Sequence, residues 1–130
     1  MISGIGIDIV QVRRMNRWLE VPGLPERYFH QDELSASLEK GELAGQSLAA
    51  RFAAKEAFGK ALGTGLAGID LRDIMVVNNR KGKPDIIVTG TALAALGQNG
   101  ADTVHLSISH ERENAVAVVI LECTNRKEVP

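Results

Sequence analysis

The stretch that decides the fold reads Arg51-Phe-Ala-Ala-Lys-Glu-Ala-Phe-Gly-Lys-Ala-Leu-Gly-Thr-Gly65. It is dominated by good helix formers, which predicts a helix that begins upstream near Ser47. Gly63 and Gly65 end this helix, because glycine adopts left-handed backbone angles without strain. At about 100° per residue, small residues gather on one side, where a neighbouring element can approach closely. This side holds Ala50, Ala53, Ala54, Ala57, Phe58 and Ala61.

Glu56 and Lys60 lie one helical turn apart on the flank of that packed side. Taken alone, they read as a surface ion pair, which contributes about 0.2–0.5 kcal/mol to a helix. Between them stands Gly59, which lowers helix propensity by roughly 1 kcal/mol relative to alanine. The rest of the chain decides whether the pair has a chemical role.

Length and composition bound the possible functions. The 130 residues are 45% apolar, which predicts one globular domain spanning residues 1–130. The net charge of 15 − 16 = −1 gives no general attraction to nucleic acid or to an anionic membrane. The single cysteine, Cys123, allows no intrachain disulfide and fits a reducing compartment. No apolar run approaches the roughly 20 residues of a membrane span, and no signal peptide is recognisable, so we expect a cytoplasmic protein.

The N-terminus predicts a strand over residues 2–7. Isoleucines alternate with small or acidic residues, so that Gly4, Gly6 and Asp8 share one face of an extended chain. This arrangement predicts open space beside a carboxylate. Asp8 reads locally either as the N-cap of the next helix or as a group facing a ligand.

Residues 9–20 are predicted to form a helix with an apolar stripe of Ile9, Val12, Met15 or Asn16, and Leu19. Its other side carries Arg13, Arg14 and Arg17, and residues 10–19 contain no acidic side chain. This local charge of +3 is interpreted either as an ordinary solvated face or as a docking surface for an acidic partner.

The remaining elements predict an α+β fold with a mainly antiparallel sheet and the long helix packed across it. His30 is expected to be solvated or to cap a helix, since no second histidine stands at metal-ligand spacing. The expected elements are helical segments at 25–29, 31–40 and 91–98, a hairpin of strands at 74–77 and 85–89, and strands at 104–109 and 115–121.

Three motifs, in this order and spacing, resemble those of one family. They are Gly4-Ile-Gly-Ile-Asp-Ile-Val10, the central stretch quoted above, and Ser107-Ile-Ser-His110. Gly82-Lys-Pro84, in the turn of the predicted hairpin, matches as well. Together they resemble the bacterial holo-(acyl-carrier-protein) synthases, the small 4′-phosphopantetheinyl transferases of fatty acid biosynthesis. The resemblance covers nearly the whole chain and is weakest between residues 20 and 47.

The resemblance implies a Mg²⁺-dependent phosphoryl transfer. The 4′-phosphopantetheine arm of coenzyme A moves to a serine hydroxyl of an apo acyl carrier protein, and adenosine 3′,5′-bisphosphate leaves. By resemblance, Asp8 and Glu56 bind the metal, and Lys60 completes the catalytic set by reaching a phosphate oxygen. This fits the preference of Mg²⁺ for carboxylates, water and substrate phosphates. The serine proton goes to one of the carboxylates or to a metal-bound water; we favour the water, because a cation lowers the pKa of its ligands.

The resemblance also implies a homotrimer with coenzyme A in clefts between subunits. His110 is expected near the 3′-phosphate, although its position in the strand also suits a partly buried structural histidine. The acidic carrier is expected to dock on Arg13, Arg14 and Arg17. The expected coenzyme A contacts are Arg51, Lys60, Gly63, Gly82, Lys83, Pro84, Ser109 and His110.

Two other functions remain as alternatives. One is a non-catalytic module that binds acidic carrier-like proteins through the basic helix, without a metal. The other is a nucleotide hydrolase that releases product without a carrier protein. Neither alternative accounts for the joint spacing of the three motifs.

Overall fold

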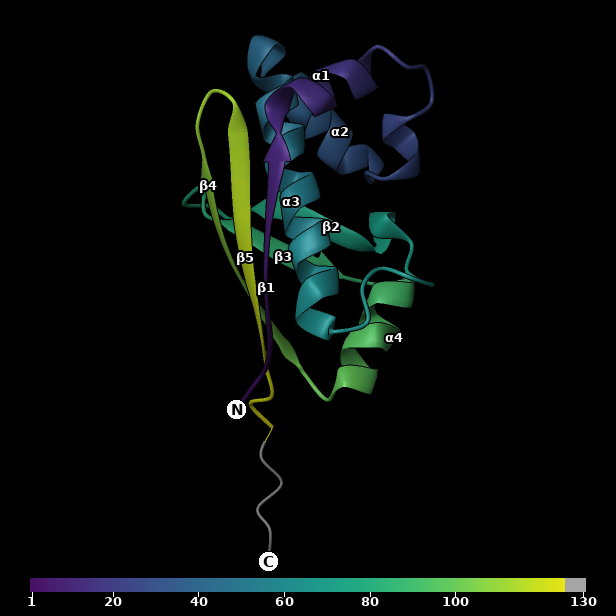
Figure 1. The fold of residues 1–130 in the computed structure, drawn as a ribbon, viewed down its shortest axis with the longest axis vertical. Helices are drawn as coiled ribbons and strands as arrows, with labels where there is room; N and C mark the ends of the chain where they lie inside the picture. Colours follow the sequence, from purple (N-terminus) through teal and green to yellow (C-terminus); the bar gives the residue numbers. More distant parts are fainter. Residues whose placement is uncertain (126–130) are drawn as a thin grey trace, which may run out of the picture.

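The computed structural model describes residues 1–125 and shows the predicted α+β architecture (Figure 1). A three-stranded antiparallel sheet has the order β1-β5-β4, and a separate hairpin pairs β2 with β3. The strands are β1 (Ile2–Gln11), β2 (Ile74–Asn78), β3 (Pro84–Val88), β4 (Thr103–His110) and β5 (Asn114–Glu122). The α-helices are α1 (Val12–Leu19), α2 (Gln31–Leu38), α3 (Ala44–Leu62) and α4 (Gly90–Asn99). Short 3₁₀ turns are η1 (Pro25–Arg27), η2 (Gly41–Leu43) and η3 (Leu71–Asp73).

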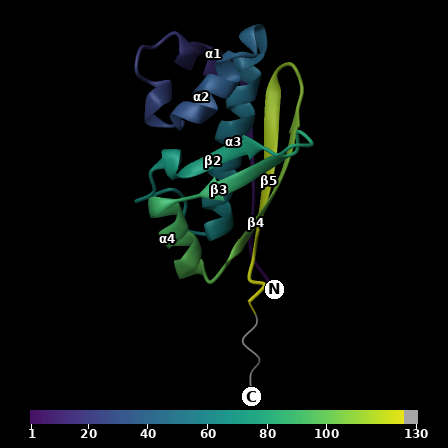
Figure 2. The same ribbon diagram turned by 180° about the vertical axis from the view of Figure 1, so that it is seen from behind.

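The long helix α3 runs through the middle of the molecule. The sheet covers one side of it, while α1 and α2 lie at one end and α4 near the other (Figures 1 and 2). The prediction of a single packed side was therefore wrong, because neighbours surround the helix on nearly all sides. Only four residues of α3 escape full burial, and all are polar: Gln46, Ser47, Glu56 and Lys60.

The helix α3 and the strand β1 touch backbone to backbone. A Cβ atom built on Gly6 would lie 2.1 Å from the Ala57 carbonyl oxygen, and one on Gly4 would lie 1.9 Å from that of Ala61. Neither distance is possible for a real side chain, so only glycine fits at these positions. The open space expected beside Asp8 is thus filled by the helix, which corrects that prediction.

Asp8 lies within β1 and does not cap a helix. The strand continues to Gln11, which occupies the N-cap position of α1, and Asp8 pairs in register with Ala117 of β5. The N-cap interpretation is therefore wrong, and so is the predicted start of the helix at residue 9. His30, in contrast, does cap α2, since its Nδ1 accepts a hydrogen bond from the Asp32 amide at 3.0 Å.

Gly59 also has a packing role. A Cβ atom at this position would lie 2.8 Å from the side chain of Leu66, which follows the end of α3. The glycine therefore admits the loop against the helix one residue before Lys60. Gly59 thus lowers helix propensity but allows Leu66 to pack against the helix.

The outer face of the sheet is apolar and uncovered in the single chain. Ile5, Ile7 and Ile9 are 67%, 59% and 63% exposed. They stand opposite Ile120, Val118 and Val116 of β5. Within residues 1–125, no helix has both the length and the apolar character required to cross a lipid bilayer.

Substitution of Gly6 by alanine tests the close approach of β1 and α3. The added methyl group meets a backbone oxygen, which cannot move away without displacing the helix. We expect Gly6→Ala to lower the free energy of unfolding by about 3 kcal/mol or more, measured by urea denaturation.

Gly97→Ala is the matched control, because a Cβ atom there meets nothing within 4 Å on a helix. We expect it to raise stability by roughly 0.5–1 kcal/mol. Equal stability of the two alanine variants would contradict the packing argument.

Candidate active site

Asp8, Glu56 and Lys60 meet where β1 crosses α3. The Lys60 ammonium donates to Asp8 Oδ1 at 3.0 Å and to the Ile7 carbonyl oxygen at 3.0 Å. The ion pair of Lys60 is therefore with Asp8 on the neighbouring strand, and the surface pair with Glu56 is not formed. The Asp8 side chain is 17% exposed and that of Lys60 is 56% exposed, so the cluster opens to solvent on the ammonium side.

The pKa of Glu56 is raised above its ordinary value. Partial burial of the carboxyl group is the largest cause, and the negative charge of Asp8 adds to it. The cations Arg14 and Lys60 act in the opposite direction. Two carboxylates thus repel each other across the contact between β1 and α3, an arrangement that a bound cation relieves.

This pair fits Mg²⁺ better than a metal that needs a closed protein site. Among residues 1–125, no group of three or more His, Cys, Asp or Glu side chains is placed to hold a metal. Mg²⁺ is usually bound by one or two carboxylates, with water and substrate phosphates completing its six ligands. Asp8 and Glu56 supply the two carboxylates.

The basic face of α1 lies beside the carboxylate cluster. The guanidinium of Arg14 lies over the rings of Trp18 and Phe52, at 5.2 and 5.1 Å from their centroids. The positive charge of Arg14 lowers the pKa of Glu56 and so partly opposes the effect of burial. Arg13 and Arg17 are exposed on the same helix. Arg14 therefore connects the basic face of α1 to the candidate metal site.

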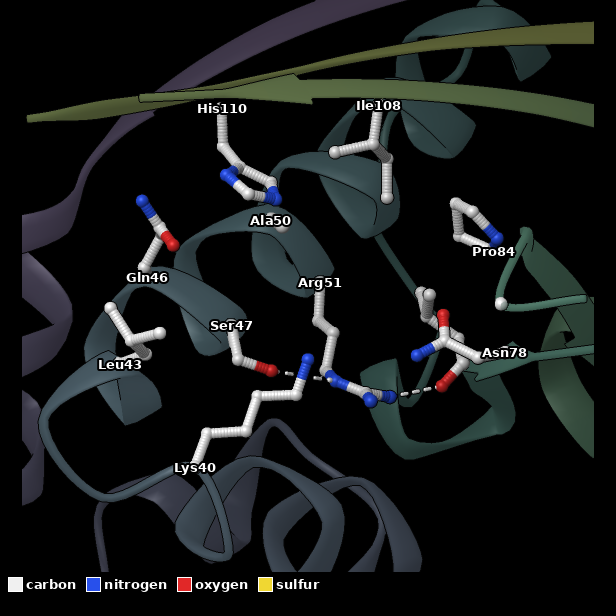
Figure 3. Close-up of a pocket in the computed structure, with 12 residues that line it drawn as sticks. Lys40, Leu43, Gln46, Ser47, Ala50, Arg51, Asn78, Pro84, Ile108 and His110 are labelled. Carbon is white, nitrogen blue, oxygen red and sulfur yellow. Dashed lines mark hydrogen bonds between the residues drawn. The ribbon is translucent and has the colours of Figure 1, made fainter. Parts of the chain in front are cut away.

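A pocket of about 310 Å³ lies near the N-terminal half of α3, against the β2–β3 hairpin and β4 (Figure 3). Four of the predicted coenzyme A contacts line it: Arg51, Gly82, Pro84 and His110. His110 is exposed, so its interpretation as a partly buried structural histidine was wrong. Polar lining residues that the sequence reasoning missed are Lys40, Gln46, Ser47 and Asn78.

The other predicted contacts lie outside this pocket. Lys60 belongs to the carboxylate cluster, and Gly63 ends α3 with a φ of 79°. Lys83 lines a different hollow, which it shares with His105. Ser109 points to the face of β4 opposite His110, because side chains alternate along a strand. Within one chain, the structure therefore divides the predicted site into two regions.

Arg51 belongs to a buried charged network under the pocket. It shares this network with Lys55 of α3 and with Glu33 of α2. Burial lowers the pKa of Lys55 and of Arg51, and the negative charge of Glu33 partly opposes this in both cases. No local pattern in the sequence indicates that these helix charges are buried.

Comparison with known proteins identifies the family of this chain. The family model of the 4′-phosphopantetheinyl transferase superfamily matches residues 4–119. The chain belongs to this superfamily. A holo-(acyl-carrier-protein) synthase of Treponema denticola is 56% identical over 122 residues, which cover 94% of this chain and 99% of that protein.

Solved structures agree with this assignment. A holo-(acyl-carrier-protein) synthase from Bacillus anthracis in complex with CoA (3′,5′-ADP) is 40% identical, with a TM-score of 0.80 and coverage of 95% of this chain and 99% of that one. The synthase of Helicobacter pylori in complex with coenzyme A is 29% identical, with a TM-score of 0.77 and coverage of 91% and 99%. The predicted family, fold and enzyme class are confirmed: the chain is a 4′-phosphopantetheinyl transferase.

The raised pKa of Glu56 predicts a stability effect in this transferase. A carboxyl group whose pKa is higher in the folded state than its ordinary 4.5 ionises less readily there, so its charge opposes folding above that pH. We expect Glu56→Gln to raise the Tm of the metal-free protein at pH 7.5. The gain shrinks as pH falls through the folded pKa and disappears below about pH 4.

Thermal denaturation with a chelator at pH 7.5 and pH 4 measures this effect. Glu26→Gln, at an exposed position of η1, is the control and leaves Tm unchanged. We expect added Mg²⁺ to raise the Tm of the unsubstituted protein but not that of Glu56→Gln. A lower Tm for metal-free Glu56→Gln at pH 7.5 would contradict repulsion between the carboxylates.

Proposed function

We propose that this transferase moves 4′-phosphopantetheine from coenzyme A to a serine hydroxyl of an apo acyl carrier protein, with Mg²⁺ and with release of adenosine 3′,5′-bisphosphate. The observation that carries the proposal is the cluster of Asp8, Glu56 and Lys60, open to solvent beside the basic face of α1. The coenzyme A complexes of the related synthases support the donor substrate. Residues 1–130 form one catalytic domain that works in the cytoplasm.

The three side chains divide the chemistry. Asp8 and Glu56 would hold Mg²⁺, which would supply positive charge to neutralise the pyrophosphate and the leaving phosphate. Lys60 donates to a phosphate oxygen of coenzyme A. Hydrogen bonds to Asp8 and to the Ile7 carbonyl oxygen hold its ammonium beside the two carboxylates. The carboxylates also orient the water that accepts the serine proton.

The nucleotide end of coenzyme A binds in the pocket against the hairpin. Arg51 and His110 bind its phosphates, with His110 at the 3′-phosphate, while Gly82, Lys83 and Pro84 border the adenine. Charge-assisted hydrogen bonds from a guanidinium suit a phosphate, which accepts two parallel N–H groups. Ser109 and Gly63 complete the contacts with the substrate.

Coenzyme A lies between subunits of a homotrimer. Arg51 and Glu56 are five residues apart on α3, which turns them about 140° from each other. Accordingly, Arg51 contacts β2, while Lys60 contacts β1. In this proposal a neighbouring copy supplies one of the two regions to each substrate, and the exposed isoleucines of β1 offer an apolar surface for assembly. Analytical ultracentrifugation tests the proposed homotrimer, and a monomer at micromolar protein concentration would contradict it.

Mass spectrometry of a carrier protein tests the reaction directly. Incubation with coenzyme A, Mg²⁺ and an apo acyl carrier protein adds one phosphopantetheine mass to the carrier. We expect Glu56→Gln to reduce the rate by about 100-fold or more, because a metal ligand is lost. Glu26→Gln serves as the control with unchanged rate. The proposal fails if none of several apo carriers gains mass.

The carrier docks on the basic face of α1. Arg13, Arg14 and Arg17 give this face a charge of +3 next to Glu56, and positive charge steers an acidic partner to the site. The family assignment favours this role over a non-catalytic module that uses the same surface.

Reversal of charge at the docking surface separates these two functions. We expect Arg13→Glu with Arg17→Glu to raise the KM for the carrier about tenfold and to weaken its dependence on salt. The KM for coenzyme A is the internal control and stays unchanged. Steady-state kinetics at two salt concentrations measure both values. An unaltered KM for the carrier would exclude this face of α1 as the docking surface.

A further inference from the structure

Lys55 is the most completely buried charged side chain of α3, with no exposed surface. Its ammonium uses all three of its N–H donors. It donates to Glu33 Oε1 at 2.7 Å, to the Leu71 carbonyl oxygen at 2.7 Å and to the Ile74 carbonyl oxygen at 2.6 Å. The side chain points away from the solvent, so Lys55 cannot itself contact a substrate.

Glu33 is buried as well and is bound on both oxygens. Besides the ammonium of Lys55, Oε1 accepts the His30 amide at 3.0 Å, and Oε2 accepts the Val76 amide at 3.1 Å. The nearest guanidinium nitrogen of Arg51 lies 3.9 Å from Oε2, beyond hydrogen-bond distance. Lys55, and not Arg51, is therefore the hydrogen-bonded cation of Glu33.

Arg51 keeps its charge without a hydrogen-bonded carboxylate among the described residues. It donates to the Val76 carbonyl oxygen and, more weakly at 3.5 Å, to Ser47 Oγ (Figure 3). Both acceptors are neutral. The network holds two cations and one anion, so one positive charge remains in excess at the wall of the pocket. A largely buried cation that shares its one carboxylate with a second cation is incompletely neutralised, and an anion in the pocket relieves this.

We propose that Lys55 is a positioning residue for coenzyme A, because it occupies Glu33 and thereby leaves Arg51 free to bind a phosphate of the nucleotide. The proposal rests on the proposed function, in which Arg51 contacts coenzyme A. Without Lys55, the buried carboxylate of Glu33 has one cation within 4 Å, namely Arg51. The guanidinium then turns to Glu33 and away from the pocket.

Binding of adenosine 3′,5′-bisphosphate, measured by titration calorimetry, tests this competition. We expect Lys55→Met to weaken binding about tenfold, similarly to Arg51→Met. The decisive variant combines Lys55→Met with Glu33→Gln. It removes both the cation and the competing carboxylate, so Arg51 is free again and affinity returns to within about threefold of the unsubstituted protein.

A purely structural role of Lys55 gives a different result. Loss of its hydrogen bonds to the Leu71 and Ile74 carbonyls displaces β2 whether or not Glu33 is charged. In that case the double variant binds as weakly as Lys55→Met, which would overturn the proposal. Unchanged binding by Lys55→Met would overturn it too. Thermal denaturation confirms that each variant is folded.

Lys55→Met leaves a buried carboxylate without its main partner and is the variant most at risk of unfolding. Lys55→Gln keeps a donor for Glu33 while removing the charge, and we expect the same weakening. The double variant buries no unpaired charge, and such neutral replacements of buried ion pairs are often tolerated. If it is folded but binds tenfold more weakly, the positive charge of Lys55 has another role and the proposal fails.

The same titrations separate this inference from the proposed function. If the unsubstituted protein does not bind the bisphosphate, the nucleotide site itself is wrong. If Arg51→Met binds normally, the contact between Arg51 and phosphate is wrong. Only the comparison of Lys55→Met with the double variant tests the role of Lys55.

Discussion

The backbone contact between β1 and α3 is the constraint on which the site depends. Glycine at positions 4 and 6 lets the strand lie directly against the helix carbonyls of Ala61 and Ala57. At this separation Asp8, two residues beyond Gly6, comes within 3.0 Å of the Lys60 ammonium and close enough to Glu56 to raise its pKa. Any larger residue at either glycine would separate the two elements and, with them, the two carboxylates. Gly4 and Gly6 thus support the proposed metal site by holding β1 against α3, without being ligands themselves.

Much of the fold could be predicted from local sequence. Helix formers and a glycine stop locate α3, alternation locates β1 and β4, and turn residues locate the β2–β3 hairpin. What could not be predicted was how the elements enclose α3, since burial on all sides depends on contacts between distant segments. Asp8 shows the same limit: an aspartate before a helical pattern favours a cap, and only the pairing of β1 with β5 shows that the strand continues past it.

Sequence motifs pointed to some residues of the candidate site and not to others. Asp8, Glu56 and Lys60 stand in long motifs, and the structure brings them together. Lys40 and Asn78 line the pocket from separate loops and strands, and no spacing in the sequence connects them. Glu33 and Lys55 were missed for another reason. Charged residues in a helix are usually solvated, and nothing local distinguishes a buried pair from an exposed one.

The charged side chains of α3 are separated into two regions, one toward β1 and one toward β2. Toward β1 the helix presents Glu56 beside Asp8, whose negative charge helps to raise the pKa of Glu56. Toward β2 it presents Arg51, whose pKa is lowered by burial and whose nearest carboxylate is hydrogen-bonded to Lys55. The Arg51 region keeps an excess of positive charge, whereas Asp8 and Glu56 are accompanied by the cations Lys60 and Arg14. A divalent cation between the two carboxylates and a phosphorylated nucleotide at Arg51 are the ligands that we propose for these two regions. In a chain with a net charge of only −1, the buried helix thus holds a pair of carboxylates and a cationic region apart from each other.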